Sequence, residues 1–420
     1  MSHSSRALFY PGWYQVGASV VGTGLSFVII AVLCFSIFVT PLQAEFGWQR
    51  GEIAIALSIT TLIQVIVNPI LGVFLDKWGI RRVLLPSLIM MPLAVASAYF
   101  LTDSLWHLYL IYLLIPVFGA GTGAMIWSRL LVNWFDRRRG MALGIGLSGI
   151  GLGAALMSTL LQSVIDNYGW REAYLVFASV VFLVSLPSAL ILVRNTPADT
   201  GLSPDEDEMS TQGLVEGGYL GDLSVAQVVR TRQYRLLMAA FVLFGVTLGG
   251  VIAHLFPMML DQGLTTSQAA TAGSAMGLAI IFGRIGCGYL LDKLYAPYVA
   301  ALFLGLPMIS IVLFAVGVND KTAILAAILF GLGVGGEFDV VAFMVSRYFG
   351  LRNFGKLYGH VYAIFQFGHC IGPIAMGIAF DRSGHYSGML WAFLVLLAIG
   401  AILMANLGEY RESGVSRVGV

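Results

Sequence analysis

The sequence has little charge for its length. Only 11% of its 420 residues are charged, whereas soluble domains have about 25%. An ordinary soluble domain of this size is therefore excluded. The net charge of +1 creates no global field that would favour nucleic acid as a partner. We expect a chain whose main surroundings are apolar.

The chain also lacks the motifs of enzymes and cofactor-binding proteins. Its cysteines, Cys34, Cys287 and Cys370, lie in apolar runs, and their spacing matches neither a redox motif nor a metal site. The glycine-rich stretches at 119–123 and 144–153 lack the Lys-Ser/Thr ending of a phosphate-binding loop. No Ser-His-Asp set stands out. We predict that the protein is not an enzyme and uses neither a cofactor nor a metal.

What the chain does have is apolar runs. Hydrophobic residues make up 58% of it, and they gather in runs of about 20 residues, the length that crosses a bilayer. We predict an all-α membrane protein of twelve transmembrane helices. The expected spans are 15–40, 53–75, 82–101, 107–133, 141–164, 172–193, 234–260, 268–291, 298–317, 322–345, 357–379 and 387–408.

One long segment in the middle is too polar to cross a membrane. It contains two prolines and the acidic run from Asp205 to Glu208. We predict an N-terminal six-helix bundle over 1–193, a cytoplasmic linker over 194–233 and a C-terminal six-helix bundle with a short cytoplasmic tail over 234–420.

The distribution of basic residues predicts the orientation. Most Lys and Arg residues fall on the side of the membrane that holds both termini, and the loops on the other side hold only Arg50, Arg171, Lys321 and Arg382. Basic residues mark cytoplasmic loops. We expect a multi-pass protein of the cell inner (plasma) membrane with both termini in the cytoplasm.

The two halves of the chain repeat each other. GVFLDKWGIRR at 72–82 corresponds to GYLLDKLYAPY at 288–298, and WFDRRRGMALG at 134–144 corresponds to YFGLRNFGKLYG at 348–359. Repeats at half the chain length indicate two like bundles related by a pseudo-two-fold axis, with a transport site between them.

These segments resemble the major facilitator superfamily. The stretch 72–82 matches its inner-loop signature between helices two and three, and 288–293 resembles the copy in the second half. The closer resemblance is to the monocarboxylate and oxalate–formate branch. It rests on FYPGWYQV at 9–16, WFDRRRGMALGIGLSGIGLG at 134–153, GRIGCGYLLD at 283–292 and RYFGLRNFGKLYG at 347–359.

The resemblance implies a transport site. In that branch a helix-eight arginine binds the substrate carboxylate, and Arg284 matches it. Some bacterial members carry a histidine in helix seven, and His254 lies in the matching stretch. Animal members have an acid four residues before the arginine, where this chain has Ile280. The resemblance also implies that the inner loops bind neighbouring helix ends when the carrier is open to the outside. The residues of this conformational gate would be Gly72, Asp76, Lys77, Arg81, Arg82 and Asp292.

Arg284 is also a candidate on physical grounds. It lies eight residues before Asp292, about 12 Å deep if Asp292 marks the membrane surface. A charge at that depth costs on the order of several kcal/mol unless it is paired, and it usually faces a cavity. A guanidinium can hold a carboxylate in two places.

Glu337 and Asp339 are the second charged feature within a span. Two residues apart on a helix, they cannot both face one cavity squarely. One of them could take the coupling proton, or Asp339 could form a static ion pair with Arg284. His254 could bind substrate or be a packing histidine.

We therefore expect a monomeric, proton-coupled carrier of a small organic carboxylate (an anion), embedded in the lipid bilayer, with no nucleic-acid partner. Two alternatives stay open. The first is a proton-driven exporter of an amphipathic drug or natural product. The second is a sensor that binds ligand without transport.

Overall fold

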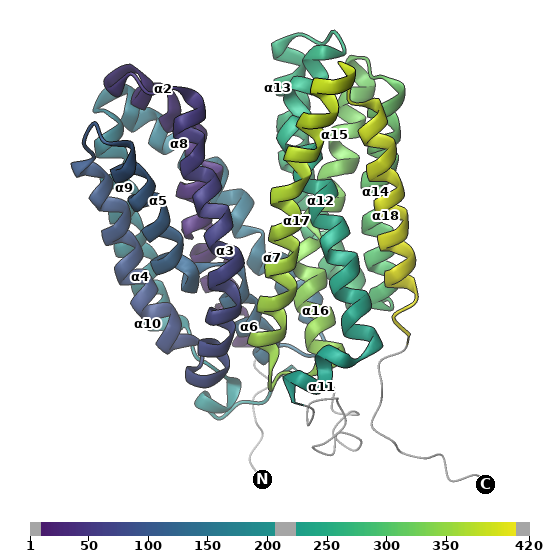
Figure 1. The fold of residues 1–420 in the computed structure, drawn as a ribbon. Helices are drawn as coiled ribbons and strands as arrows, with labels where there is room; N and C mark the ends of the chain where they lie inside the picture. The colour runs from purple at the N-terminus through teal and green to yellow at the C-terminus, as the bar shows by residue number, and fades with distance from the viewer. Residues whose placement is uncertain (1–9, 206–223, 409–420) are drawn as a thin grey trace, which may run out of the picture.

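The computed structural model describes residues 10–205 and 224–408, which form helices and connecting turns. Within them, twelve segments are long and apolar enough to cross a membrane. Figure 1 shows two bundles standing side by side, the first half of the chain in one and the second half in the other. The predicted all-α, twelve-helix architecture in two bundles is confirmed.

The first bundle contains six spans, several of them built from two helices. They comprise α1 (Gly12–Gly24), α3 (Arg50–Trp78), α4 (Ile80–Ala96), α5 (Leu105–Gly119) with α6 (Ala124–Trp134), α7 (Arg139–Leu147) with α8 (Gly149–Asn167), and α9 (Trp170–Val180) with α10 (Leu186–Leu192).

The second bundle follows a short helix, α11 (Val225–Arg230). Its six spans are α12 (Arg232–Asp261), α13 (Thr266–Leu291), α14 (Ala296–Val316), α15 (Asp320–Gly335) with α16 (Glu337–Phe349), α17 (Phe354–Ser383) and α18 (Ser387–Ala405).

The first span is less regular than the sequence suggests. One continuous helix was expected over 15–40, but α1 ends at Gly24 and a π-helical turn follows at Ile29–Leu33 before α2 (Phe35–Phe46). The backbone is pinned at this break, because the Phe27 N–H donates to the Thr122 hydroxyl, 3.2 Å away. Such tertiary contacts override the local helical pattern.

Glycines break the fourth and tenth spans at matching places. The fourth passes through a 3₁₀ turn at Ala120–Thr122, and the tenth bends at Gly336, where α15 ends and α16 begins. A Cβ on Gly335 would lie only 2.3 Å from the Ile280 carbonyl oxygen. The bend therefore lets α16 start tight against α13, and its first turn carries Glu337 and Asp339.

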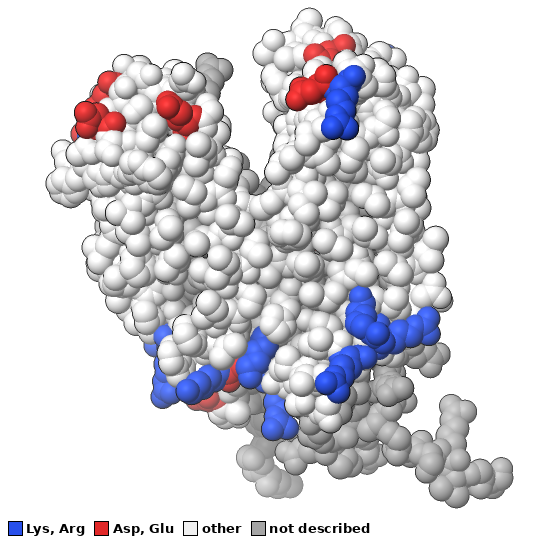
Figure 2. All heavy atoms as spheres, in the orientation of Figure 1, with Lys and Arg blue, Asp and Glu red and all other residues white. Residues whose placement is uncertain are grey.

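The two bundles touch at one end and separate at the other. Across the interface, α3 packs against α17 and α7 packs against α13. This contact lies toward the end that holds the first and last described residues, Tyr10 and Gly408, which bind Trp134 and Tyr348. The space-filling view is hollowed between the bundles at the opposite end (Figures 1 and 2). We call these the terminal end and the open end.

Candidate functional site

Arg284 lies on α13 where the two bundles meet. Its carbonyl oxygen would be 2.7 Å from a Cβ on Gly144 of α7, so the backbone here lies directly against the other bundle. The side chain is only 3% exposed, and its Nη1 has no hydrogen-bond partner among the described residues. The guanidinium carbon is 5.4 Å from the centre of the Phe338 ring. A cation–π contact stabilises the charge but leaves its N–H donors free.

Two buried carboxyl groups face this region from the first turn of α16. Asp339 is fully buried and neither of its oxygens has a hydrogen-bond partner in the described chain, while Glu337 is 9% exposed with Oε2 unpartnered. Both acids lie close enough to Arg284 for their charges to interact. Within the described residues, however, neither forms an ion pair of 4.0 Å or less with it. The static pair left open by the sequence is not formed in this conformation.

Phe338 separates the two acids. Its half-buried ring lies 5.5 Å from the Tyr362 ring and beside the Arg284 guanidinium. Because successive helix positions differ by about 100°, Glu337 and Asp339 project to either side of Phe338. The first turn of α16 therefore presents an aromatic ring toward Arg284 and α17, with one carboxyl on each flank.

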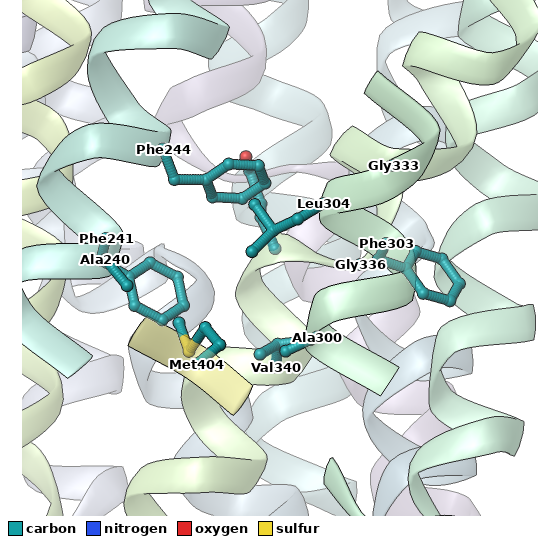
Figure 3. Close-up of a pocket in the computed structure, with 11 residues that line it drawn as sticks. Ala240, Phe241, Phe244, Ala300, Phe303, Leu304, Gly333, Gly336, Val340 and Met404 are labelled. Carbon is teal, nitrogen blue, oxygen red and sulfur yellow. The ribbon is translucent and has the colours of Figure 1, made fainter. Parts of the chain in front are cut away.

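Glu337 is one of the residues that line a pocket inside the C-terminal bundle. The pocket lies between α12, α14, α15, α16 and α18. Figure 3 shows the apolar side chains that surround it, among them Phe244, Leu304 and Met404. The other lining residues are Ala240, Phe241, Phe244, Ala300, Phe303, Leu304, Gly333, Gly336, Val340 and Met404. No helix of the N-terminal bundle contributes to this lining.

Two hydroxyl groups complete the polar cluster, and neither is predicted from the sequence. Ser128 on α6 and Tyr358 on α17 are fully buried, and neither hydroxyl has a hydrogen-bond partner within the described residues. Tyr358 lies near Ser128 and interacts electrostatically with Arg284 and Asp339. A signal was available, since Tyr358 belongs to the repeated segment 348–359 and shares a helix face with Phe354 and Tyr362 at a spacing of four.

His254 is placed apart from this cluster by its contacts. Its Nε2 is 3.1 Å from the Pro373 carbonyl oxygen and its Nδ1 is 3.3 Å from the Tyr386 hydroxyl. A neutral imidazole with the proton on Nε2 satisfies both contacts, donating to the carbonyl and accepting from the phenol. A carboxylate would have to displace one of these partners to reach His254.

Two of the gate residues, Asp76 and Asp292, form hydrogen bonds across the interface between the bundles. Asp76, at the end of α3, accepts hydrogen bonds from the Gly355 and Lys356 N–H groups at 2.8 and 2.9 Å. Asp292, at the end of α13, accepts from the Gly140 and Met141 N–H groups at 2.5 and 2.8 Å. Each carboxylate thus caps a helix of the opposite bundle, where free N–H groups favour negative charge. The direct partners of both carboxylates are therefore backbone amides at helix ends, and not basic side chains.

Gly72 belongs to the same interface. A Cβ at this position would lie 2.1 Å from the Gly355 carbonyl oxygen. Lys77 and Arg82 are exposed and form no hydrogen bond or ion pair with the described part of the chain. Arg81 binds the Leu190 and Val193 carbonyls of its own bundle. The structure therefore brings Gly72, Asp76 and Asp292 to the bundle interface, and the other three gate candidates lie elsewhere.

Two arginines add a second mirrored pair at the terminal end. Arg129 on α6 donates to the Leu351 carbonyl in the turn before α17, and lies over the Phe354 ring at 5.4 Å. Arg347 on α16 donates to the Asp136 carbonyl in the turn before α7, at 2.8 Å, and pairs with the Asp136 carboxylate at 3.0 Å. The closed end is therefore held by matching contacts in both directions.

Burial changes the pKa of Asp292, the gate carboxylate that lies just beyond the end of a membrane span. It raises the pKa of Asp292 to about 6, although the N–H groups of Met141 and Gly140 act in the opposite direction. The cost of desolvation thus outweighs the two hydrogen bonds.

The family model of the Major Facilitator Superfamily matches residues 19–341. Human monocarboxylate transporter 11 is 24% identical, with 94% of this chain and 83% of that protein covered. The uncharacterized MFS-type transporter YhjX of Escherichia coli is also 24% identical, with 83% of this chain and 85% of that protein covered.

The fold is shared with solved structures. The transporter FucP in its outward conformation aligns with a TM-score of 0.70 at 15% identity, covering 94% of this chain and 99% of that chain. A family model that spans most of the chain, together with the observed pair of six-helix bundles, identifies a transporter rather than an enzyme. The chain belongs to the Major Facilitator Superfamily.

Proposed function

We propose that the protein carries a small organic carboxylate together with a proton across the cell inner membrane by alternating access. The observation that carries the proposal is the state of Arg284, a buried guanidinium with a free Nη1 at the bundle interface. Its planar set of donors fits a carboxylate in two places. The names of relatives such as human monocarboxylate transporter 11 support this substrate class.

The neighbouring acids supply a reason for proton coupling. An ionised Asp339 would compete electrostatically with an incoming carboxylate for Arg284. Protonation of Asp339 removes this competition, so the proton and the substrate bind more tightly together than either does alone. The acid that animal relatives carry four residues before the arginine is replaced here by Ile280. In this proposal Asp339 on α16 supplies the acidic group beside the arginine instead.

Glu337 and His254 have secondary places in the proposal. Glu337 lines the apolar pocket of Figure 3, and its charge also interacts with that of Arg284. His254 has partners on both ring nitrogens, so it would shape the outer part of the C-terminal wall and exchange Tyr386 for substrate only transiently.

The charge distribution supports an orientation. On the face shown in Figure 2, Lys and Arg side chains gather at the terminal end and most acidic side chains lie toward the open end. By the positive-inside rule, the terminal end would face the cytoplasm and the cleft would open outward.

Transport would follow when the caps formed by Asp76 and Asp292 break and the bundles 1–193 and 234–420 rock about the site. The segment 194–233 would join them as a cytoplasmic linker within a monomer, although 206–223 lie outside the described residues.

The test is uptake into proteoliposomes that contain the purified full chain. Radiolabelled acetate, L-lactate, pyruvate and succinate are supplied with and without an inward proton gradient. We expect gradient-dependent uptake of at least one monocarboxylate and its loss in Arg284→Ala, with Arg284→Lys retaining a weaker activity because it keeps the charge but not the fork. Undiminished uptake by Arg284→Ala would refute the assignment. Gradient-independent uptake would refute the coupling.

A further inference from the structure

We propose that Tyr358 and Ser128 form the route by which the coupling proton moves between Asp339 and the terminal end. The inference rests on the proposed function, because it needs a proton on Asp339. It assigns a role to two hydroxyl groups from opposite bundles, and it predicts a functional defect different from that of losing the substrate arginine.

The first observation is where the unpartnered polar atoms lie. Most buried side-chain nitrogen and oxygen atoms without a hydrogen-bond partner, in the described chain, belong to one group of residues: Ser128, Arg284, Glu337, Asp339 and Tyr358. Buried polar groups are normally paired. A concentration of exceptions at the interface of two moving bundles indicates groups whose partners are exchanged during transport.

The second observation is the connection that Tyr358 makes. Its ring stacks on Tyr362 at 6.1 Å, and Tyr362 lies 5.5 Å from Phe338, which covers Arg284. On the other side its ring is 5.4 Å from Phe354, over which Arg129 lies. Tyr358 therefore stands between the charged cluster and the contacts that close the terminal end.

The third observation is that the two hydroxyls come from different bundles. Ser128 precedes Arg129, which binds the Leu351 carbonyl across the interface. Tyr358 lies one turn after Gly355 and Lys356, whose N–H groups bind Asp76. Separation of the bundles at the terminal end must move Ser128 relative to Tyr358, since each is tied to one side of that contact.

The charged groups around this route are identified by the same contacts. Arg284 on α13 and the two acids on α16 lie on one side of Tyr358. On the other side are Arg129 on α6 and, interacting with it electrostatically, Asp76 on α3. Tyr358 lies near enough to Ser128 and to both acids for these groups to interact, although no hydrogen bond joins them in this conformation.

The proton transfer needs no reactant other than water, and every proton is accounted for. The Asp339 carboxyl gives its proton to the Tyr358 oxygen while the Tyr358 proton moves to the Ser128 oxygen. The Ser128 proton then passes to water from the terminal side. Each hydroxyl ends with one proton, because a hydroxyl both donates and accepts, and one proton leaves the carboxyl. In the present conformation Ser128 and Tyr358 are fully buried, so the proton stays on the carboxyl until the bundles separate at the terminal end.

The experiment compares Tyr358→Phe with Tyr234→Phe in proteoliposomes, using L-lactate, pyruvate and acetate as probes. Tyr234 is a matched control, because its hydroxyl is also buried without a hydrogen-bond partner but its ring packs on Phe349. Two rates are measured for each variant. The first is net uptake driven by a proton gradient, and the second is exchange of labelled for unlabelled substrate at equal pH. Exchange does not require the proton to leave.

We expect Tyr358→Phe to lower net uptake about a hundredfold, the lower end of the contribution of a positioned proton-transfer group, with exchange kept near the wild-type rate. Ser128→Ala should act in the same direction, and Ser128→Thr should restore net uptake. Tyr234→Phe should keep both rates. Thermal stability of each purified variant checks folding.

An equal loss of exchange and net uptake in Tyr358→Phe would overturn the route, as would no loss of either. Failure of the underlying function has a different signature, because then the wild type shows no gradient-dependent uptake or Arg284→Ala retains it.

Discussion

Asp76 and Asp292 hold equivalent positions in the two bundles, and each accepts two backbone N–H groups from the first turn of a helix in the opposite bundle. The helices they cap, α17 and α7, follow the turns that receive Arg129 and Arg347. A repeat visible in the sequence has thus become a reciprocal contact between halves. Because hydrogen bonds from N–H groups to a carboxylate depend on direction and distance, these contacts cannot survive separation of the bundles.

The first prediction concerns the balance between conformations. Asp76→Ala removes two hydrogen bonds to a charged group, each worth about 1.5–3 kcal/mol, so the population closed at the terminal end should fall several-fold or more. Spin labels on the two bundles at the open end, measured by electron paramagnetic resonance, should report shorter distances. Arg82→Ala is the control, since Arg82 is exposed. Distances unchanged in Asp76→Ala would show that the cap does not hold this conformation.

The second prediction concerns close packing at the same interface. Gly72→Ala places a Cβ 2.1 Å from a carbonyl oxygen of the opposite bundle, an overlap that costs about 1–3 kcal/mol in this conformation alone. The same spin-label distances should shift in the direction seen for Asp76→Ala. Gly277→Ala is a suitable control, because nothing lies within 4 Å of a Cβ there. Equal behaviour of the two variants would contradict the packing argument.

The third prediction concerns pH. The pKa of Asp292 is about 6 when the terminal end is closed, and it should return toward about 4 when the carboxyl is solvated in the other conformation. The closed conformation then binds a proton more tightly, so it gains stability as the pH falls through this interval and loses it as the pH rises. The spin-label distances should lengthen between about pH 6 and pH 4, and Asp292→Asn should reduce that change. A shift of the opposite sign would exclude Asp292 as its cause.

Much of the fold could be predicted because the bilayer imposes simple rules on sequence. Runs such as 387–408 have few alternatives to a spanning helix, and α18 is found at Ser387–Ala405. The first span was less predictable, because the break after Gly24 depends on a hydrogen bond to Thr122, far away in the chain. Local patterns do not contain such contacts.

The candidate site was only partly predictable, for a similar reason. Charge inside a span is conspicuous in a sequence, so Arg284, Glu337 and Asp339 were found. A buried serine such as Ser128 has no such signal, because the residue type is common in membrane helices. The separate directions of Glu337 and Asp339 followed from helix geometry, but which of them lines the apolar pocket depends on how α16 packs after Gly336.

The fourth prediction separates the two acids of α16. Asp339→Asn keeps the size of the side chain but cannot exchange a proton, so uptake should lose its dependence on the proton gradient while binding of the carboxylate persists. Glu337→Gln should leave that dependence in place, because Glu337 faces the apolar pocket. The measurement is the ratio of uptake with and without the gradient for both variants, beside a thermal-shift titration with the same substrate. Loss of gradient dependence in Glu337→Gln, with Asp339→Asn unaffected, would show that Glu337 is the residue that carries the coupling proton. It would also contradict the route through Tyr358, since that route begins at Asp339.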